Sequence, residues 1–437
     1  MTETLFIFAL VLLPLWAFGA DSPALRDLMT PGTTREVLAV PVPAAAPDEE
    51  LIDSCIKVVM DSTTAPAPPA PPPPPPYAPR WQKVKIPDIA DDLTPDSARK
   101  AFGDTAAYWR PRPAQTVTLA GETYTGEELA LGFEALSRAV NGGRGSLNRA
   151  IEESFDVYQS MRKQDNTDEY TGEGKVTGYY APEIPVDSAQ QPREVPVFRH
   201  PAVVPDDPSV PAGMQTRKVG RCQILGGALA GQGLEMYWTS PTDLMSLQTE
   251  GSGFGKLPDG SKVFLGYAGG NGRKWRGVSG ALLDVRSCCM KSGSDCGLPP
   301  KAMGTRALVS FLKSQPANRE LMMTCLDPSF VFFSEDHDGP KGALGVLLTA
   351  GRSVAVDRQQ VPLGLPGLLS SRLPPSSSGP GAAFTRLIVT HDVGGAIKGG
   401  ARVDLYWGEG PEAEAVGGTM NNPGRLYILL PRHSEYP

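Results

Sequence analysis

Three aspartates near the end of the chain stand in stretches that are otherwise apolar or rich in glycine. Asp357 ends the run GRSVAVD, Asp392 lies in RLIVTHDVGGAIKGG, and Asp404 lies in ARVDLYWGEG. Each stretch contains β-branched or aromatic residues in a pattern that predicts a β-strand. A carboxylate on a mostly buried strand is costly unless it is hydrogen-bonded or has a chemical role. Taken singly, each aspartate is better explained as a side chain that ties down a turn or loop.

The neighbours of Asp404 bear on whether it could donate a proton. Apolar surroundings raise the pKa of a carboxyl group, which keeps the group protonated. Strand alternation, however, places Arg402 and Tyr406 on the same face as Asp404. A close guanidinium would lower that pKa, so we expect Arg402 to point away or to pair elsewhere.

Other kinds of chemistry have little support in the sequence. The chain has four histidines, no two of them four residues apart, and no cluster of ligand residues has metal-site spacing. No G-x-S-x-G turn lies between a predicted strand and a predicted helix, as a serine nucleophile would require. The net charge of −7 and the absence of a basic tract argue against binding to nucleic acid. We therefore expect no cofactor, no metal and no nucleic acid partner.

The 437 residues have room for two or three domains, and 48 glycines and 44 prolines indicate a turn-rich, mostly β protein. A capping box from Thr125 to Glu128 predicts a helix. A second helix is expected after Gly142, a third over 305–314, and a short one, with no obvious partner, in DEELIDSCIKVVM. The second should present Leu147, Ile151, Phe155 and Tyr158 on one face. The turn at 258–260 predicts a β-hairpin.

The N-terminal region indicates export. The apolar stretch from Leu5 to Phe18 is too short for a confident membrane span, and small residues at 17 and 19 predict cleavage of a signal peptide before Ala20. Because the first residues include Glu3 and no Lys or Arg, an uncleaved anchor is the alternative. Residues 65–79 are mostly proline and predict a polyproline II spacer.

Six cysteines fit an oxidising compartment. Five of them fall between Cys222 and Cys325, and Cys55 stands alone in the N-terminal tail. A disulfide from Cys296 to either Cys288 or Cys289 is favoured over a zinc site, because paired C-x-x-C spacing and nearby histidines are absent. The remaining pairing stays open.

Several motifs, in this order along the chain, resemble one known family. They are Thr177-Gly178-Tyr179-Tyr180, GQGLEMYWTSPTDLMSLQTEGSG, GYAGGNGRKW, LDPSFVFF, and the DVGGAIKG and DLYWG pair around the last two aspartates. From about Trp81 to Pro431 the chain resembles the membrane-bound lytic murein transglycosylase A family with its three-aspartate (3D) domain.

The resemblance implies a fold and a set of boundaries. It predicts a discontinuous double-psi β-barrel from residues 81–181 plus 326–437, with the 3D segment at about 340–432. A second, small β-barrel-like domain at 182–325, with a few helices, would be inserted, and a glycan would lie in the groove between them. Residues 1–20 would be a signal peptide or anchor, and 21–80 a low-complexity tail with the proline-rich linker.

The resemblance also implies an activity. Members cleave the β-1,4 bond between N-acetylmuramic acid and N-acetylglucosamine in peptidoglycan. One carboxyl group acts as acid and then as base, and the substrate's own C6 hydroxyl closes a 1,6-anhydro ring. The family pattern assigns that carboxyl to Asp404. We expect an exported, monomeric, periplasmic protein. The family is found at the outer membrane, but no cysteine follows the apolar stretch here to carry a lipid.

The remaining site residues follow from the same resemblance. Thr177 would orient the catalytic carboxyl, Asp392 would either support it or cap the glycine-rich turn, and Asp357 would be structural. Lys398 would stabilise developing charge or be a solvated loop lysine. Tyr179 or Tyr180 would stack on a sugar. The groove wall would contain Glu250, Gly251, Ser252, Tyr267, Ala268, Asn271 and Trp275.

Three departures from the family pattern keep alternatives open. Glu250 stands where Gln is usual, Trp275 where Tyr is usual, and Gly277 where Ser is usual. A second carboxyl, from Glu250 or Glu235, would permit a lysozyme-like hydrolase. A non-catalytic wall-binding module is the other alternative.

Overall fold

The computed structural model describes residues 47–64, 80–164, 169–210, 217–336, 338–375 and 381–433. The predicted signal segment and the proline-rich spacer lie outside these ranges. Among the helices within them, none has the length and apolar character needed to cross a membrane.

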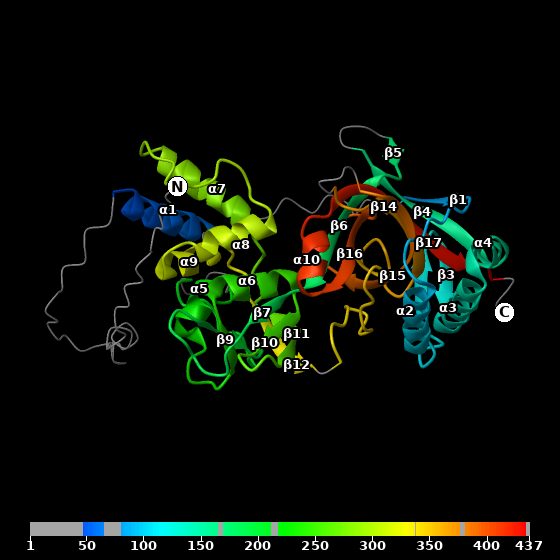
Figure 1. The fold of residues 1–437 in the computed structure, drawn as a ribbon, viewed down its shortest axis with the longest axis horizontal. Coiled ribbons are helices and arrows are strands. Elements are labelled where there is room, and N and C mark those ends of the chain that lie inside the picture. Colours follow the sequence, from blue (N-terminus) through cyan, green and yellow to red (C-terminus); the bar gives the residue numbers. More distant parts are fainter. Residues whose placement is uncertain are drawn as a thin grey trace, which may run out of the picture. The chain divides into compact units, whose positions relative to one another are not determined.

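The largest sheet has nine strands, six of which close into a barrel (Figure 1). The strand order runs β1-β4-β17-β14-β15-β13-β16-β6, and β6 pairs back to β17. Pairings β13–β15 and β16–β6 are parallel, whereas the other pairs are antiparallel. The strands are β1 (Arg80–Val84), β4 (Phe155–Lys163), β5 (Tyr170–Thr171), β6 (Gly174–Ala181), β13 (Ser353–Val356), β14 (Pro366–Arg372), β15 (Ala383–Val393), β16 (Arg402–Glu409) and β17 (Asn421–Pro431). The prediction of a mostly β protein built on a barrel is confirmed.

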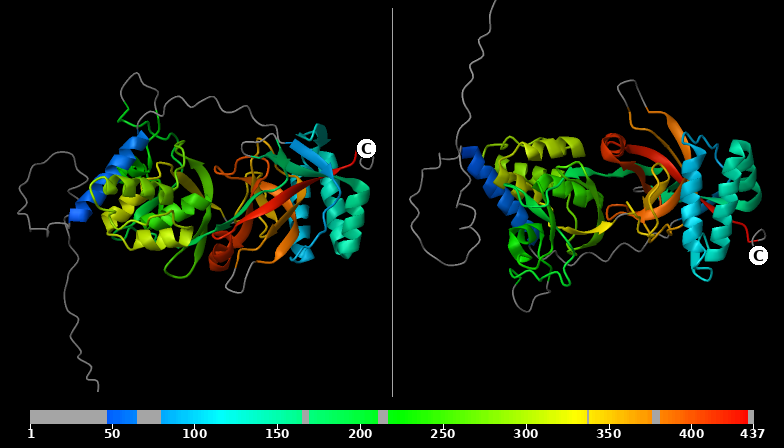
Figure 2. Two further views of the ribbon diagram at one scale, coloured as in Figure 1. Left: turned by 90° about the horizontal axis from the view of Figure 1, so that it is seen from above. Right: turned by 60° about the horizontal axis from the view of Figure 1, so that its bottom comes forward.

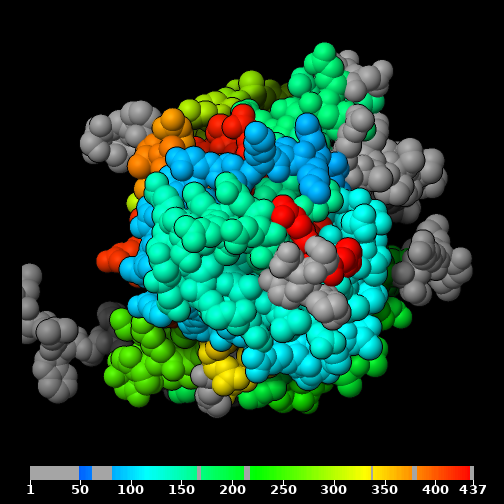
Figure 3. Space-filling view, turned by 90° about the vertical axis from the view of Figure 1, so that its right-hand side faces the viewer, coloured from blue at the N-terminus to red at the C-terminus, as the bar shows by residue number. Residues whose placement is uncertain are grey.

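One apolar core fills the barrel and extends beneath the helices that cover it. All four residues of β13 are buried, as are most residues of β15, so their sequences are nearly continuous apolar runs. Helix α2 (Pro95–Trp109) is joined to the barrel by the Trp109 indole N–H, which donates to Gly364 O at 2.9 Å. In Figure 3 the segment coloured blue to teal, from about residue 80 to about residue 155, covers most of this face of the molecule.

The helices beside the barrel follow the predicted caps. Helix α3 (Gly126–Asn141) starts at the expected capping box, and α4 (Gly143–Ser154) follows the glycine break. The prediction that the apolar face of α4 extends to Phe155 was wrong, because the helix ends at Ser154 and Phe155 begins β4. Pairing of β4 with both β1 and β17 outweighs the local helical spacing. A small hairpin, β2 (Thr116–Leu119) and β3 (Glu122–Thr125), precedes α3.

The chain between the two parts of the barrel forms two smaller sheets. The first has the order β12-β11-β10-β7, and the second pairs β8 with β9. The predicted hairpin at 258–260 is confirmed, since it joins β10 to β11 and Asp259 accepts from Ser261 N at 2.8 Å. The strands are β7 (Glu183–Pro185), β8 (Val195–Phe198), β9 (Glu235–Thr239), β10 (Gly253–Lys256), β11 (Lys262–Gly270) and β12 (Val331–Asp336).

Helices make up much of this same region. The predicted helix at 305–314 is present as α8. The other helices were not predicted. The apolar side chains around them form two separate clusters. The helices are α5 (Arg221–Gln223), the π-helix η2 (Ile224–Ala228), α6 (Pro241–Glu250), α7 (Val278–Met290), α8 (Thr305–Lys313) and α9 (Ala317–Thr324).

Helix α1 (Pro47–Thr64), predicted from the sequence without an obvious partner, packs against α7 and α9 (Figure 2). Ile52 and Ile56 are buried, and a Cys55–Cys288 disulfide joins α1 to α7. Arg319 Nε donates to Asp53 Oδ1 at 2.8 Å. This packing could not be predicted from local sequence patterns, because α7 and α9 lie more than 200 residues away from α1 in the chain.

Two further disulfides complete the set. Cys222 is bonded to Cys325, and Cys289 is bonded to Cys296. Of the two alternatives left open for Cys296, the structure selects Cys289. All six cysteines are thus paired outside the nine-stranded sheet.

Candidate active site in the barrel wall

Strand register brings the predicted acidic and hydroxyl groups together. Because β16 and β6 are parallel neighbours, Asp404 lies opposite Thr177 and Tyr406 lies opposite Tyr179. On its other edge β16 pairs with β13, where Ala355 lies opposite Asp404. In the pairing of β13 with β15, the same Ala355 lies opposite Asp392. The last two aspartates therefore stand on strands separated by one strand.

Asp404 is half-buried, and its surroundings suit a proton donor. Burial raises the pKa of the Asp404 carboxyl to about 6, and the negative charge of Asp392 adds to this. A hydrogen bond from Thr177 and the charge of Arg402 act in the opposite direction. Oδ1 is buried and has no hydrogen-bond partner among the described residues. A carboxyl oxygen in such a position favours the neutral acid.

Arg402 pairs with a group other than Asp404, which was one of the two alternatives expected from the sequence. Its Nη2 donates to Thr177 Oγ1 at 3.4 Å. The guanidinium does lower the pKa of Asp404, but burial outweighs it.

Asp392 is held by three hydrogen bonds. Oδ1 accepts from Ala343 N at 2.9 Å and from Val393 N at 2.8 Å, and Oδ2 accepts from the Tyr179 hydroxyl at 3.1 Å. The Tyr179 ring in turn packs against Tyr406, with ring centroids 5.2 Å apart. Asp392 thus fixes the tyrosine that lies beside the Asp404 strand.

The glycine-rich loop is tethered by Asp357 and not by Asp392. Asp357 Oδ2 accepts from Gly399 N at 2.9 Å, and Oδ1 accepts from Gln359 N at 3.2 Å. Lys398, next to this tether, is exposed on the loop. His391 faces the opposite side of β15 from Asp392, between Thr105 and Ser353, each at 2.8 Å. Burial lowers the pKa of His391 to about 3, so it remains neutral.

A second carboxyl, from Glu250, lies at the end of α6. This helix starts at Ser240, whose hydroxyl accepts from Asp243 N at 3.1 Å, and stops at Gly251, which adopts φ +88°. Burial and the negative charge of Asp404 raise the pKa of Glu250 to about 8. A hydrogen bond from the main chain of Tyr180 lowers this pKa, but it is the weaker effect. Ser252 is half-buried in the following turn.

The two tyrosines of the Thr177 motif differ in exposure. Tyr180 is 4% exposed, so its ring is largely inside the protein, while Tyr179 is half-buried. Tyr267 and Trp275 are 63% and 51% exposed, and Ala268 is half-buried beside a β-bulge in β11. These two exposed rings are available for stacking on a ligand.

Asn271 has a structural role, which corrects its assignment to the glycan surface. Its side chain is 2% exposed. Nδ2 donates to Val219 O and Pro328 O, and Oδ1 accepts from Arg273 N and Phe330 N. These four bonds use the full capacity of the amide.

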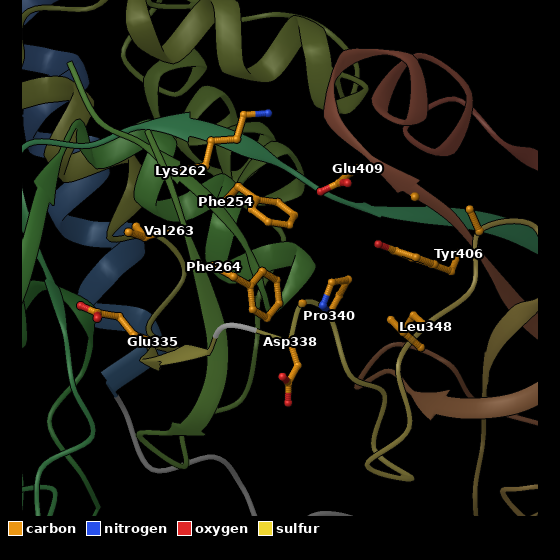
Figure 4. A pocket seen from close by; sticks show the side chains of 13 residues that line it. Phe254, Lys262, Val263, Phe264, Glu335, Asp338, Pro340, Leu348, Tyr406 and Glu409 are labelled. Atoms are coloured by element: carbon orange, nitrogen blue, oxygen red, sulfur yellow. The ribbon is translucent and has the colours of Figure 1, made fainter. Parts of the chain in front are cut away.

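Two cavities flank the carboxyl groups. The larger, of about 630 Å³, is lined by Tyr406 and Glu409 of β16 and by Phe254, Phe264 and Glu335 of the smaller sheet (Figure 4). The sequence predicted that Tyr406 shares a strand face with Asp404, but it predicted none of these five residues as part of the site, because a single Phe or Glu on a short strand carries no signal. The smaller cavity, of about 180 Å³, is lined by residues that include Tyr180, Glu250 and Trp275.

Comparisons with known proteins identify the class. Residues 352–430 match the family model described as the 3D domain, and residues 175–334 match the one described as the MltA specific insert domain. The chain is 32% identical over 303 residues to the membrane-bound lytic murein transglycosylase A of Escherichia coli K12, which covers 68% of this chain and 75% of that protein. The corresponding Vibrio cholerae protein is 31% identical over 263 residues, or 58% and 64% of the two chains.

Solved structures agree with this result. The membrane-bound lytic murein transglycosylase from Agrobacterium tumefaciens superposes with a TM-score of 0.61 at 27% identity, over 82% of this chain and 99% of that one. The E. coli MltA structure with bound chitohexaose gives 0.62 at 26% identity, over 81% and 95%. The chain belongs to the membrane-bound lytic murein transglycosylase A family, and it is an enzyme of the lytic transglycosylase class.

Proposed function

We propose that this protein cleaves peptidoglycan glycan strands between N-acetylmuramic acid and N-acetylglucosamine, with Asp404 as the one catalytic carboxyl. The observation that supports this most strongly is the half-buried Asp404 beside Thr177, with its pKa raised to about 6. A group with that pKa can be protonated when substrate binds and ionised after the first step.

The reaction needs two proton transfers. Protonated Asp404 first gives its proton to the glycosidic oxygen, and the bond from that oxygen to C1 of the muramic acid residue breaks. The ionised carboxylate then takes the proton of the C6 hydroxyl, whose oxygen bonds to C1 of the oxocarbenium-like centre. The products are a 1,6-anhydromuramoyl end and a new N-acetylglucosamine end, and Asp404 regains its proton.

The surrounding residues support these steps in the proposal. Thr177 orients the carboxyl, and Asp392 fixes Tyr179 and raises the pKa of Asp404 by its charge. Lys398, on its tethered loop, stabilises charge near the reacting bond. The exposed Tyr267 and Trp275 stack on sugar rings, while Gly251, Ser252 and Ala268 form adjoining wall.

We propose the domain arrangement that the family resemblance implies. Closure of the barrel requires strands on both sides of the insertion, β6 before it and β13 to β17 after it, which supports a discontinuous double-psi barrel over 81–181 and 326–437. Because β12 pairs with β11, a boundary after Asp336 fits the strands better than one at 325. Export to the periplasm, with residues 1–20 as signal or anchor, remains part of this proposal, as does a monomeric state.

One alternative has a specific observation in its favour. The charge of Asp404 raises the pKa of Glu250, so the two carboxyl groups sense each other and could act as a hydrolytic pair. Glu235 is a weaker partner, because it lies on β9, opposite Phe198 of β8.

Mass analysis of the products released from purified sacculi tests the proposal. We expect anhydromuramoyl products, which are lighter by one water molecule than reducing products. Release of reducing N-acetylmuramic acid ends would overturn the proposed mechanism in favour of hydrolysis, with Glu250 as the second carboxyl.

A further inference from the structure

The cavity of about 180 Å³ lies where three helices meet. The last turns of α6 contribute Met245 and Glu250, the segment before α7 contributes Trp275, and α8 contributes Leu308 and Val309. Its volume is less than a third of that of the cavity of about 630 Å³, so it suits a single substituent better than a run of sugar rings. The cavity of about 630 Å³ beside Tyr406 has the larger space that a chain needs.

The lining of the small cavity combines apolar side chains with the carboxyls of Glu250 and Asp327 and the guanidinium of Arg276. Asp327 is paired with Arg221, and Arg276 is paired with Asp284, so Glu250 is the carboxyl available to a ligand. Met245, Met303 and Leu308 supply flexible or branched apolar surface, and Tyr180 is almost fully buried beside them. Methionine adapts its shape to a small guest. Trp275, which is 51% exposed, stands at the same cavity and offers a flat face.

We propose that this cavity binds a secondary amide that carries a methyl group, with the Glu250 carboxyl paired to the amide and Met245, Met303 and Leu308 around the methyl. This inference rests on the proposed function, because peptidoglycan supplies such an amide from two sources. One is the acetamido group of an N-acetylhexosamine, and the other is an alanyl residue of the stem peptide.

Glu250 has the hydrogen-bonding character that this pairing requires. A trans secondary amide points its carbonyl and its N–H in opposite directions, so one carboxyl group pairs with one of the two. A neutral carboxyl can donate its O–H to the amide carbonyl, which an ionised carboxylate cannot do. With its pKa raised to about 8, Glu250 is neutral at pH 7. It can then replace the glutamine that the family usually has at this position, since both side chains present one donor face and one acceptor face.

The position of the cavity relative to the reacting carboxyl also fits. Glu250 is bonded to the main chain of Tyr180, and Thr177, three residues earlier on β6, lies opposite Asp404. Three residues of a strand span roughly 10 Å, which is about the length of two sugar rings. A substituent in the cavity would therefore fix the register of the glycan at the cleavage site.

Binding of defined probes to the full-length Asp404→Asn protein tests the inference by calorimetry and by saturation transfer to methyl protons. The probes are chitohexaose, which carries acetamido groups, cellohexaose, which is neutral and lacks them, and a free stem tetrapeptide. Val309→Phe and Ser246→Phe fill the cavity from two different helices, since both residues are half-buried and line it. Val203→Phe is the matched control, because Val203 is 72% exposed and does not line it.

We expect both filling variants to bind chitohexaose at least tenfold more weakly than the parent, and Val203→Phe to bind it equally well. Cellohexaose should bind the parent at least tenfold more weakly than chitohexaose and be insensitive to the filling variants. If the tetrapeptide is instead the probe that the filling variants exclude, the amide comes from the stem peptide.

Unchanged binding of all probes to both folded filling variants would overturn the inference. So would equal binding of cellohexaose and chitohexaose together with no binding of the tetrapeptide. Neither result depends on cleavage, so failure of the proposed mechanism, seen as reducing ends in the product assay, is distinguished from failure of the amide site.

Discussion

The barrel and the region between its two parts are stabilised in different ways. The nine-stranded sheet shares one apolar core with its covering helices and contains no cysteine. Residues 182–336 divide their apolar side chains between two clusters, one of which is completed by α1. Two disulfides lie within these residues, and the third joins them to Cys55 of α1. A small core buries less surface per residue, so covalent links contribute more to its stability.

The same contrast applies to the functional groups. Asp404 sits inside a strand that is paired on both edges, whereas Glu250, Tyr267 and Trp275 lie at helix ends, bulges and loops. Proton transfer requires a carboxyl fixed to within a fraction of an ångström, and a doubly paired strand provides this. The three departures from the family pattern, at 250, 275 and 277, all fall outside the barrel. We therefore expect the barrel to determine the chemistry and the other region to determine which glycan is accepted.

Replacement of Asp404 should produce the largest effect. We expect Asp404→Asn to reduce sacculus lysis by about 1,000-fold, because an amide cannot perform either proton transfer. Folding and binding of glycan should persist, as checked by circular dichroism and sacculus pull-down. Asp88→Asn, at an exposed aspartate, is the control. Lysis within a few-fold of wild type would remove Asp404 from its assigned role.

Removal of single disulfides should lower the stability of the region that contains them without changing the stability of the barrel. We expect loss of Cys55–Cys288, by Ser at both positions, to destabilise α1 and α7 by about 4 kcal/mol, because it closes a very long loop. Loss of Cys289–Cys296, which spans seven residues, should cost about 2 kcal/mol. Hydrogen exchange should show faster opening of α1 with β14 and β15 unchanged. Equal acceleration throughout the barrel strands would contradict the independence of the two regions.

Activity should follow the protonation of Asp404. Because the acid form is required, kcat/KM should fall about tenfold per pH unit above pH 6, where the carboxyl ionises. Asp392→Asn removes a charge that raises this pKa, so the fall should begin at lower pH. The raised pKa also means that the stability contributed by protonated Asp404 is present below about pH 4 and is lost as pH rises through 6. A profile that is flat from pH 5 to 8 would contradict the acid role.

The smallest expected change comes from Glu250→Gln. An amide keeps both a donor and an acceptor, so we expect lysis within a few-fold of wild type and an unchanged anhydro product. Glu250→Ala, which keeps neither, is the informative companion and should weaken glycan binding. Loss of cleavage in Glu250→Gln, with reducing ends from the native enzyme, would identify Glu250 as a second catalytic carboxyl.

The sequence by itself determined a good part of this protein. The capping box at Thr125 and the turn at Asp259 were predicted correctly, because both are local hydrogen-bond patterns. The order of the motifs indicated the family, and the family pattern assigned the catalytic carboxyl to Asp404. These features depend on residues close together in the chain or on matches to a known pattern.

Only the tertiary structure decided the rest. The partner of α1, the Cys55–Cys288 link and the pairing of Phe155 into β4 each depend on chain segments far away in the sequence. The structural use of Asn271 and the contact between Arg402 and Thr177 depend on where backbone and side chains meet across strands and loops. The pKa of Asp404 was left undecided by the sequence, since apolar neighbours and Arg402 act in opposite directions. Burial in the folded barrel outweighs the guanidinium, because desolvation of a carboxylate depends on everything packed around it and not on its neighbours in the chain.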